Sequence, residues 1–325
     1  MGGLSAIKPL VRRHTEIGIF LIAVALVFLF SATSDGKWAN VYNIGTILQV
    51  TATLGLMTLG VALVIGTGEI DISVGSTFGM GALVYLWLAT RIDPAFAVMA
   101  ATATGCAIGF FNGFLVTRTG TPSLIITLGS LMIFRGIAIA LTEGFSFSIP
   151  YAARNGWSFS ILGGGDFLGF NTAIYWLILL AVVLTVVLKA TPFGNRLLAV
   201  GGSAESAHSR GVRVDRIKLS AFVICGMLAA FAGSLEAGKL GFADGSMGRL
   251  MELQAIASCV LGGCLLAGGR ISLAGALAGA FVLSSIQSYL VVMSVRPQWF
   301  MLLLGIIVVL AAYGDRSLRQ WALKR

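Results

Sequence analysis

The sequence predicts an all-α integral membrane protein with about ten transmembrane helices in one polytopic domain that covers residues 1–325. Of its 325 residues, 57% are hydrophobic and 11% are charged, and the mean hydropathy is +0.94. Soluble domains carry about 25% charged residues, so this chain lacks the polar surface that water requires. The apolar residues form unbroken runs, whereas the strands of a membrane barrel would alternate apolar and polar side chains. Helices are therefore expected, because lipid cannot satisfy an open backbone.

Ten apolar runs are long enough, or nearly long enough, to cross the hydrocarbon core of a bilayer. They cover residues 17–32, 47–65, 75–88, 95–116, 123–141, 173–188, 219–235, 253–266, 273–292 and 298–313. The first run follows Lys8, Arg12 and Arg13 as in a signal peptide, but the many later spans favour a retained helix. The runs 75–88 and 253–266 are short and bordered by glycine, which is typical of the broken helices of transporters.

The distribution of basic residues predicts the orientation. With the N-terminus in the cytoplasm, fifteen of the 22 Lys and Arg residues fall in cytoplasmic segments and six in the opposite connections; Arg135 alone lies within a span. Because Lys and Arg are concentrated on the cytoplasmic side of membrane proteins, both termini are predicted to be cytoplasmic. The net charge of +9 does not indicate a nucleic-acid partner, since the basic residues do not form one patch or stripe.

Two connections are longer than the others. Residues 142–172 are expected outside the cytoplasm, and residues 191–218, the basic segment, inside it. In the basic segment, Pro192 and Gly194 are expected to break the preceding helix. Gly201 and Gly202 predict a tight turn, and Ser203 can N-cap a short helix. This pattern fits either a solvated basic loop or a short helix held parallel to the membrane.

The basic segment also resembles the ATPase-docking segment of ribose-type ABC transporter permeases, which share a broad family with branched-chain amino acid permeases. The family pattern runs F-G, A-x-G-G, an alanine-rich turn and S-G-(I/V). The matching residues are Phe193, Gly194, Ala199, Gly201, Gly202, Ala207, Gly211 and Val212. Ser203 replaces the usual asparagine, and Arg210 replaces the usual serine before the glycine.

Two further stretches resemble the same family. GEIDISVG (68–75) is similar to its G-G-I-D-L-S-V-G, and TPSLIITLGSLMIFRGIA (121–138) is similar to its P-x-F-I-x-T-L-G-x-x-x-x-x-R-G. The three motifs occur in the family's order, and the likeness extends over residues 17–313.

The resemblance implies a type II ABC importer-like fold and the role of a permease subunit that translocates a monosaccharide or a related polar solute. It also implies ABC ATPase subunits docked on the basic segment, a periplasmic sugar-binding protein, and a second permease copy or paralogue in the lipid of a bacterial inner membrane. The chain has no GxxxxGK[ST] phosphate loop, so ATP and Mg are expected in the ATPase, with no cofactor and no enzymatic activity in this chain.

Polar residues in or beside the predicted spans are candidates for the solute path, because charged groups at membrane depth are costly. They are Thr53, Thr58, Glu69, Asp71, Thr127, Ser130, Arg135 and Gln287. No Lys or Arg is expected near Glu69 and Asp71, and Asp71 could instead cap a helix through the amide of Ser73. Arg135 could bind a sugar hydroxyl, pair with Glu143 or reach the headgroups. The Ser and Thr hydroxyls could instead join neighbouring helices.

Two other classes of function are considered. A secondary transporter driven by an ion gradient would need ionisable residues near mid-membrane, and few are present. An intramembrane enzyme would need a motif such as HExxH or GxSxG, and the sequence has neither. The four cysteines form no CxxC pair and predict neither a metal site nor disulfides. Gly105, Gly109 and Gly113 predict close packing of their helix against another.

Overall fold

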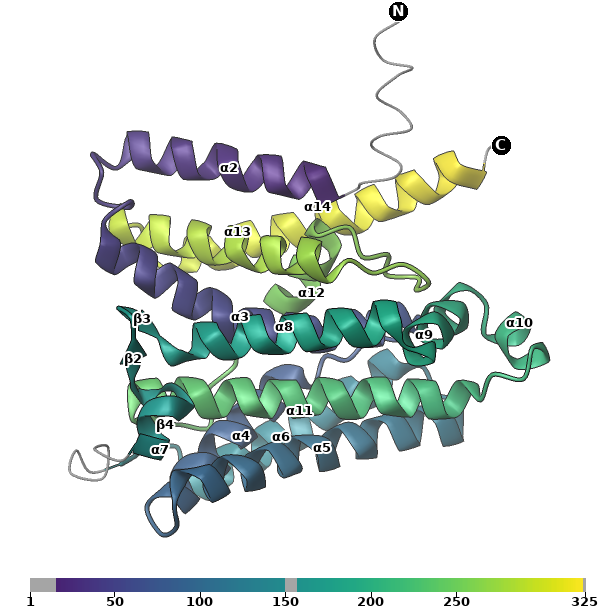
Figure 1. Ribbon diagram of the computed structural model, residues 1–325, viewed down its shortest axis with the longest axis horizontal. Helices are drawn as coiled ribbons and strands as arrows, with labels where there is room; N and C mark the ends of the chain where they lie inside the picture. The colour runs from purple at the N-terminus through teal and green to yellow at the C-terminus, as the bar shows by residue number, and fades with distance from the viewer. Residues whose placement is uncertain (1–15, 150–156, 324–325) are drawn as a thin grey trace, which may run out of the picture.

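The computed structural model describes residues 16–149 and 157–323. Long helices run side by side along one direction and form a bundle (Figure 1). The main helices are α2 (Glu16–Thr33), α3 (Val41–Gly66), α4 (Val74–Ala89), α5 (Pro94–Thr119), α6 (Ser123–Thr142), α8 (Thr172–Ala190), α9 (Pro192–Gly202), α10 (Ala204–Ser209), α11 (Val214–Leu240), α12 (Met251–Leu261), α13 (Leu273–Val292) and α14 (Gln298–Leu323). The basic residues Lys8, Arg12 and Arg13 lie outside the described part of the chain.

Each of the ten apolar runs overlaps a helix. In the described part of the chain, six helices are long and apolar enough to cross a membrane by themselves: α3, α5, α6, α8, α11 and α13. The apolar parts of α2, α4, α12 and α14 are shorter. The chain is therefore an all-α, multi-pass membrane protein.

The predicted run 253–266 is wrong at its C-terminal end. Helix α12 begins at Met251 and ends at Leu261, so residues 262–266 are not part of it. Gly262 follows the last helical residue, and Gly263 has a φ of 85°, a left-handed conformation that glycine adopts without steric penalty.

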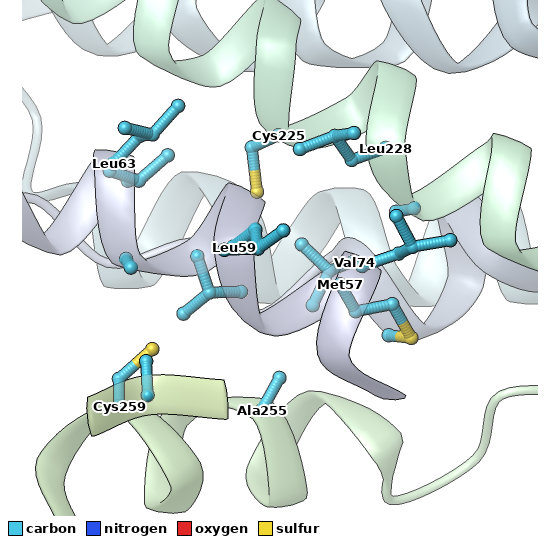
Figure 2. Packing of buried hydrophobic residues seen from close by; sticks show 14 of the residues in the cluster. Met57, Leu59, Leu63, Val74, Cys225, Leu228, Ala255 and Cys259 are labelled. Atoms are coloured by element: carbon cyan, nitrogen blue, oxygen red, sulfur yellow. The ribbon is translucent and has the colours of Figure 1, made fainter. Parts of the chain in front are cut away.

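Helix α3 forms the centre of the bundle, and all of its residues from 51 to 66 are buried. Figure 2 shows Cys225 and Leu228 of α11 on one side of α3, and Ala255 and Cys259 of α12 on the other. The helices approach closely here: a Cβ atom on Gly60 would lie 2.8 Å from the Cα atom of Cys225. Such small residues let membrane helices gain packing contacts that the surrounding lipid does not drive.

The predicted glycine row on α5 packs as expected. A Cβ atom on Gly105 would overlap the carbonyl of Gly226, and one on Gly109 would overlap the backbone of Phe222, both in α11. Of the four cysteines, Cys106 is half-buried and the other three are buried, and none of the four forms a disulfide within the described residues. They occupy the interior as small apolar side chains.

The two ends of the bundle differ in structure. Helices α9 and α10 lie at one end, together with the first described residues of α2 and the last turn of α14 (Figure 1). The opposite end carries α7 (Trp157–Phe159), a π-helical turn η2 (Ser160–Gly164) and two antiparallel strand pairs. The pairs are β1 (Phe147–Ser148) with β4 (Phe242–Ala243), and β2 (Asp166–Phe167) with β3 (Phe170–Asn171). The described parts of the connections 142–172 and 191–218 therefore lie at opposite ends.

Candidate functional site

Most of the basic segment folds into the two short helices α9 and α10, and its last five residues, 214–218, belong to α11. The helix break predicted at Gly194 is wrong, because Gly194 lies within α9. Pro192 occupies the first turn of α9, where its missing N–H is not needed, and the Thr191 hydroxyl accepts a hydrogen bond from the amide of Phe193 at 3.3 Å. The Ser203 hydroxyl accepts from the amide of Ser206 at 3.2 Å and caps α10, as predicted. Gly211, with a φ of 82°, follows that helix.

The predicted turn at Gly201 and Gly202 is wrong, because both glycines are the last helical residues of α9. The helix continues through them since the amide of Ser203 still donates to the carbonyl of Ala199, at 3.1 Å. The chain changes direction one residue later, at Ser203, which has extended backbone angles.

The eight residues of the family pattern form two groups. Five pack against the chain itself: Phe193, Gly194, Gly201, Ala207 and Val212. Three are exposed: Ala199, Gly202 and Gly211. Only the exposed group is open to a partner, and the small size of Gly194, Gly201 and Ala207 is already explained by contacts within the chain.

The last turn of α9 packs directly on the backbone of two other segments. We call the set Gly66, Gly68, Gly201, Gly268 and Gly269 the glycine junction. The amide of Gly269 donates to the carbonyl of Gly66 at 3.1 Å, and a Cβ atom on Gly201 would overlap that same carbonyl. A Cβ atom on Gly268 would lie 2.7 Å from the nitrogen of Gly68 and 2.8 Å from the carbonyl oxygen of Gly201. Helix α9 is therefore joined to the end of the central helix α3 through backbone contacts.

Sequence reasoning did not identify the glycine junction. The available signal was the likeness between GEIDISVG (68–75) and AGGRISLAG (267–275), two glycine-bordered stretches that the fold brings together beside α9. The likeness alone does not show that the two stretches touch, because contact depends on how α3 and α13 pack.

Asp71 lies in the break between α3 and α4 and is 1% exposed. Its Oδ1 accepts from the amide of Ser73 at 2.8 Å and from the Ser73 hydroxyl at 2.7 Å. The Asn112 side chain of α5 donates to that hydroxyl at 2.7 Å. This chain of donors stabilises the turn that leads into α4, which is the structural role considered for Asp71. Asn112 was not among the candidates from sequence.

The same break is tied to α6. The amide of Ile70 donates to the Ser123 hydroxyl at 3.0 Å, and the Thr127 hydroxyl lies 3.3 Å from the carbonyl of Ile70 and 2.8 Å from that of Ser123. Thr127 therefore joins two segments, as Ser and Thr commonly do between membrane helices.

The prediction that Glu69 has no basic neighbour is wrong. The Lys218 Nζ atom lies 2.5 Å from Glu69 Oε1, and about a fifth or less of each side chain is exposed. Lys218 is 149 residues away along the chain, at the start of α11, and reaches Glu69 only because α11 packs along α3 and α4. The sequence contains no local sign of this pair.

Four other path candidates form no common site. The Thr53 and Thr58 hydroxyls donate to carbonyls of their own helix, from Val50 and Leu54. The Ser130 hydroxyl is buried with no hydrogen-bond partner among the described residues. Gln287 is exposed on α13. No hydrogen bond within 16–149 and 157–323 links these four side chains to one another.

Arg135 binds backbone carbonyls and does not pair with Glu143. Its Nη1 atom donates to the carbonyl of Gly245, at 3.1 Å, and to that of Met247. Both carbonyls belong to residues 244–250, the re-entrant segment, which joins β4 to α12. The sequence left three alternatives open for Arg135, and none of them included these carbonyls, because Gly245 and Met247 lie more than 100 residues along the chain from Arg135.

Glu252, at the start of α12, was also missed. It is 8% exposed, its Oε1 atom accepts from the amide of Leu250 at 3.2 Å, and its Oε2 atom has no hydrogen-bond partner among the described residues. Gly75 of α4 packs on this carboxylate so closely that a Cβ atom would overlap it. The short, glycine-bordered run after residue 252 was the one sequence signal for a special segment here.

The contacts of the described residues are those of packing between helices and loops. No group of three or more His, Cys, Asp or Glu side chains within them is placed to hold a metal ion. The arrangement instead offers a short helical surface at one end of the bundle, joined to α3, and a deep irregular segment held by Arg135.

Comparison with known proteins identifies the family. Residues 43–312 match the family described as "Branched-chain amino acid transport system / permease component". The chain is 30% identical to the xylose transport system permease protein of Escherichia coli strain K12, over 98% of this chain and 95% of the relative. It is 32% identical to the autoinducer 2 import system permease protein of Salmonella typhimurium strain LT2, over 92% and 85% of the two chains.

A third relative is the ribose import permease protein of Bacillus subtilis strain 168, 32% identical over 93% of each chain. No solved structure matches the chain significantly. Since the family match covers most of the chain, and the relatives align over nearly all of it, the protein belongs to the permease-component family of branched-chain amino acid transport systems.

Proposed function

We propose that this chain is the membrane-spanning permease subunit of an ATP-driven ABC importer, and that its solute is a monosaccharide or a related polar molecule. The observation that carries the proposal is the alignment with the xylose permease over 98% of this chain and 95% of the relative. The relatives named for autoinducer 2 and ribose extend the likeness to other small polar solutes.

The proposed topology has about ten spans in one polytopic domain of type II importer-like fold, with both termini in the cytoplasm of a bacterium and the domain in its inner membrane. The ten apolar helices support the count, although four are short. The charge distribution supports the orientation. The described start of α2 and the end of α14 also lie at the same end of the bundle as α9 and α10, which belong to the basic segment (Figure 1).

The proposed partners follow from the two ends of the bundle. ABC ATPase subunits, which hold ATP and Mg, dock on α9 and α10 through the exposed group Ala199, Gly202 and Gly211, and the glycine junction transmits their movement to α3. A periplasmic binding protein delivers the solute at the opposite end, where residues 142–172 lie. A second permease copy or paralogue completes the membrane part within the lipid.

Reconstitution tests the function. Proteoliposomes would contain this chain with the ATPase and binding protein of its own transport system, and uptake of radiolabelled D-xylose and D-ribose would be measured. Uptake is expected only with ATP on the ATPase side and binding protein on the opposite side. Accumulation of either sugar by this chain alone, driven by a proton or sodium gradient, would instead establish a secondary transporter.

Docking is tested by Gly202→Trp. Gly202 is exposed and a Cβ atom there meets nothing within 4 Å, so the variant is expected to fold but to lose co-purification of the ATPase. Ser160→Trp, exposed at the opposite end, is the matched control and should keep the ATPase bound. Ala207→Glu is unsuitable, because Ala207 is only 3% exposed and a carboxylate there would disturb the fold itself. Normal assembly of Gly202→Trp would contradict docking at this surface.

A further inference from the structure

The re-entrant segment, residues 244–250, turns back into the helix bundle. It starts after β4 at the end opposite α9, and its Gly248 packs on Gly75 while the carbonyl of Met247 packs on Gly79. Gly79 lies ten residues before the end of α4 at Ala89, so the segment reaches about 15 Å below that end. This is about half of a hydrocarbon core of roughly 30 Å.

Glycines on α4 and in the segment allow the segment to pack this deeply against α4. A Cβ atom on Gly79 would lie 2.8 Å from the carbonyl oxygen of Met247, and one on Gly248 would overlap the carbonyl of Gly75. The segment therefore lies in a groove on α4 that any larger residue would close. Leu250, with a φ of 67°, ends the segment, and α12 starts from there as a helix of only 11 residues.

Four charges lie around the segment. The guanidinium of Arg135 interacts electrostatically with the side chains of Glu252, Arg249 and Asp244. Two of the four groups are basic and two are acidic, so the cluster carries no net charge when all are ionised. Asp244 also organises the segment, since its Oδ1 atom accepts from the amide and the hydroxyl of Ser246, at 2.7 and 2.6 Å.

One face of the segment is exposed in the single chain. Ser246 and Arg249 are exposed, and the Arg249 guanidinium forms no hydrogen bond with any residue of 16–149 or 157–323. Irregular backbone at membrane depth occurs where it is buried in protein or lines a water-filled cavity, and an arginine at the centre of a bilayer is costly. Lipid is therefore excluded as the neighbour of this face.

We propose that the exposed face of the re-entrant segment lines a water-filled passage for an uncharged polyhydroxyl solute. Arg249 donates hydrogen bonds to the solute's hydroxyl oxygens, the Ser246 hydroxyl takes part in the same network, and Arg135 is the positioning residue that holds the segment. This inference rests on the proposed function, and it names the residues that line the path of the solute. A cluster without net charge suits a neutral solute, whose hydroxyls both donate and accept hydrogen bonds.

A cavity lies near this segment, between α4, the end of α6 and β1. Its volume is about 500 Å³, within the range of roughly 300–1,000 Å³ usual for ligand pockets. Its lining includes Met80 and Trp87 of α4, Glu143, and Phe147 of β1. Met80 follows Gly79, on which the segment packs, and Phe147 pairs with Ala243, the residue before the segment. The cavity therefore lies between the segment and the end of the bundle at which the solute is proposed to enter.

Thiol labelling tests the passage in the complete transporter. Ser246→Cys is made in a Cys106→Ser background, because Cys106 is the half-buried native thiol. It is treated from outside with a charged, membrane-impermeant methanethiosulfonate, and the reaction rate and D-xylose or D-ribose uptake are measured. Val24→Cys is the control, since Val24 is 54% exposed on the apolar helix α2. Ser246→Cys is expected to react at least about tenfold faster, because the reactive thiolate forms in water and hardly in hydrocarbon.

The outcomes separate the two proposals. Modification of Ser246→Cys should also block uptake, whereas treatment of Val24→Cys should leave it unchanged. If Ser246→Cys reacts as slowly as Val24→Cys while the transporter still shows ATP-driven uptake, the passage is overturned and the proposed function stands. If Ser246→Cys reacts quickly but uptake follows an ion gradient and needs no ATP, the passage stands and the proposed function fails.

Arg135→Gln in the Ser246→Cys background tests positioning. If Arg135 holds the segment, the variant should change the labelling rate several-fold and reduce uptake, while the ATPase still co-purifies. Arg135→Lys should restore part of both, because lysine still donates to a carbonyl. An unchanged labelling rate at residue 246 would show that Arg135 does not position the segment.

Discussion

The glycine junction and the re-entrant segment solve the same problem in different ways. In both, main chain from segments far apart in the sequence packs closely on main chain through glycines. In the junction, Gly201, Gly66 and Gly269 place backbone against backbone. In the re-entrant segment, a glycine groove on α4 supplies the space, but the side chain of Arg135 satisfies the carbonyls. The comparison shows that a segment beside α9 can be held by main chain alone, whereas the deeper segment depends on a charged side chain.

Gly201→Val should have the largest effect, because it removes the close approach on which the junction depends. The added side chain would meet the carbonyl of Gly66 and the nitrogen of Gly269, which are backbone atoms that cannot rotate away. The free energy of unfolding should fall by about 3 kcal/mol, which is the size of loss expected when a side chain is forced into a rigid, well-packed site. The measurement is thermal unfolding in detergent, followed by tryptophan fluorescence.

The same substitution at the neighbouring residue is the control. Gly202→Val places its side chain in open space and should change the free energy of unfolding by less than about 1 kcal/mol. Equal stability of the two variants would mean that α9 can shift without cost, and the proposed transmission through the junction would lose its basis.

Arg135→Met should have the next largest effect and act on the re-entrant segment alone. It leaves the carbonyls of Gly245 and Met247 without their donor, and the free energy of unfolding should fall by about 2 kcal/mol. Arg196→Met, exposed on α9, is the matched control and should be nearly neutral. If both variants unfolded at the same temperature, the segment would be held by its glycine contacts, as the junction is.

Ser73→Ala tests whether a hydroxyl relay adds to the rigidity near the junction. The variant removes the link between Asn112 and Asp71, leaves the Asn112 amide unpaired, and should lower the free energy of unfolding by about 1.5 kcal/mol. Adding Asn112→Ala should cost little more, since the two residues act in one network. Fully additive losses, measured by the same unfolding assay, would show that the relay is not one unit.

The Glu69–Lys218 pair should give the smallest effect. In a double-mutant cycle with Glu69→Gln and Lys218→Met, the coupling energy should be about 1 kcal/mol. This is the upper end of the coupling energies usual for ion pairs that are partly exposed to solvent. The coupling should fall as salt is raised, because ions screen exposed charges. A coupling that does not change between low and high salt would place this pair in a drier environment than its exposure indicates.

Several features could be predicted because their signals are local. The ten apolar runs predicted helices at the right places, since burial in lipid requires a helix wherever polar residues are absent. Ser203 predicted the start of α10, because capping acts within three residues, whereas Pro192 predicted only a break in the preceding helix and not the helix α9 that begins there. The three family motifs predicted the family that the comparisons establish.

Other features could not be predicted because their partners are distant in the chain. Lys218 reaches Glu69, and Arg135 reaches Met247, only after α11 and α6 have packed on α4. The eight candidates for the solute path were chosen for polarity alone. The structure assigns Asp71 and Thr127 to hydrogen bonds that join segments, and leaves Gln287 on the surface.

The sequence by itself determined that the chain is helical, that it crosses a membrane many times and that it carries the motifs of a permease family. The tertiary structure alone decided what each small or charged residue does. Gly201 and Gly202 are adjacent and chemically identical, yet one is packed against the backbone of Gly66 and the other faces open space. Composition and helix signals act over a few residues, whereas close contacts depend on which helices meet and on which face of each helix is turned toward the other.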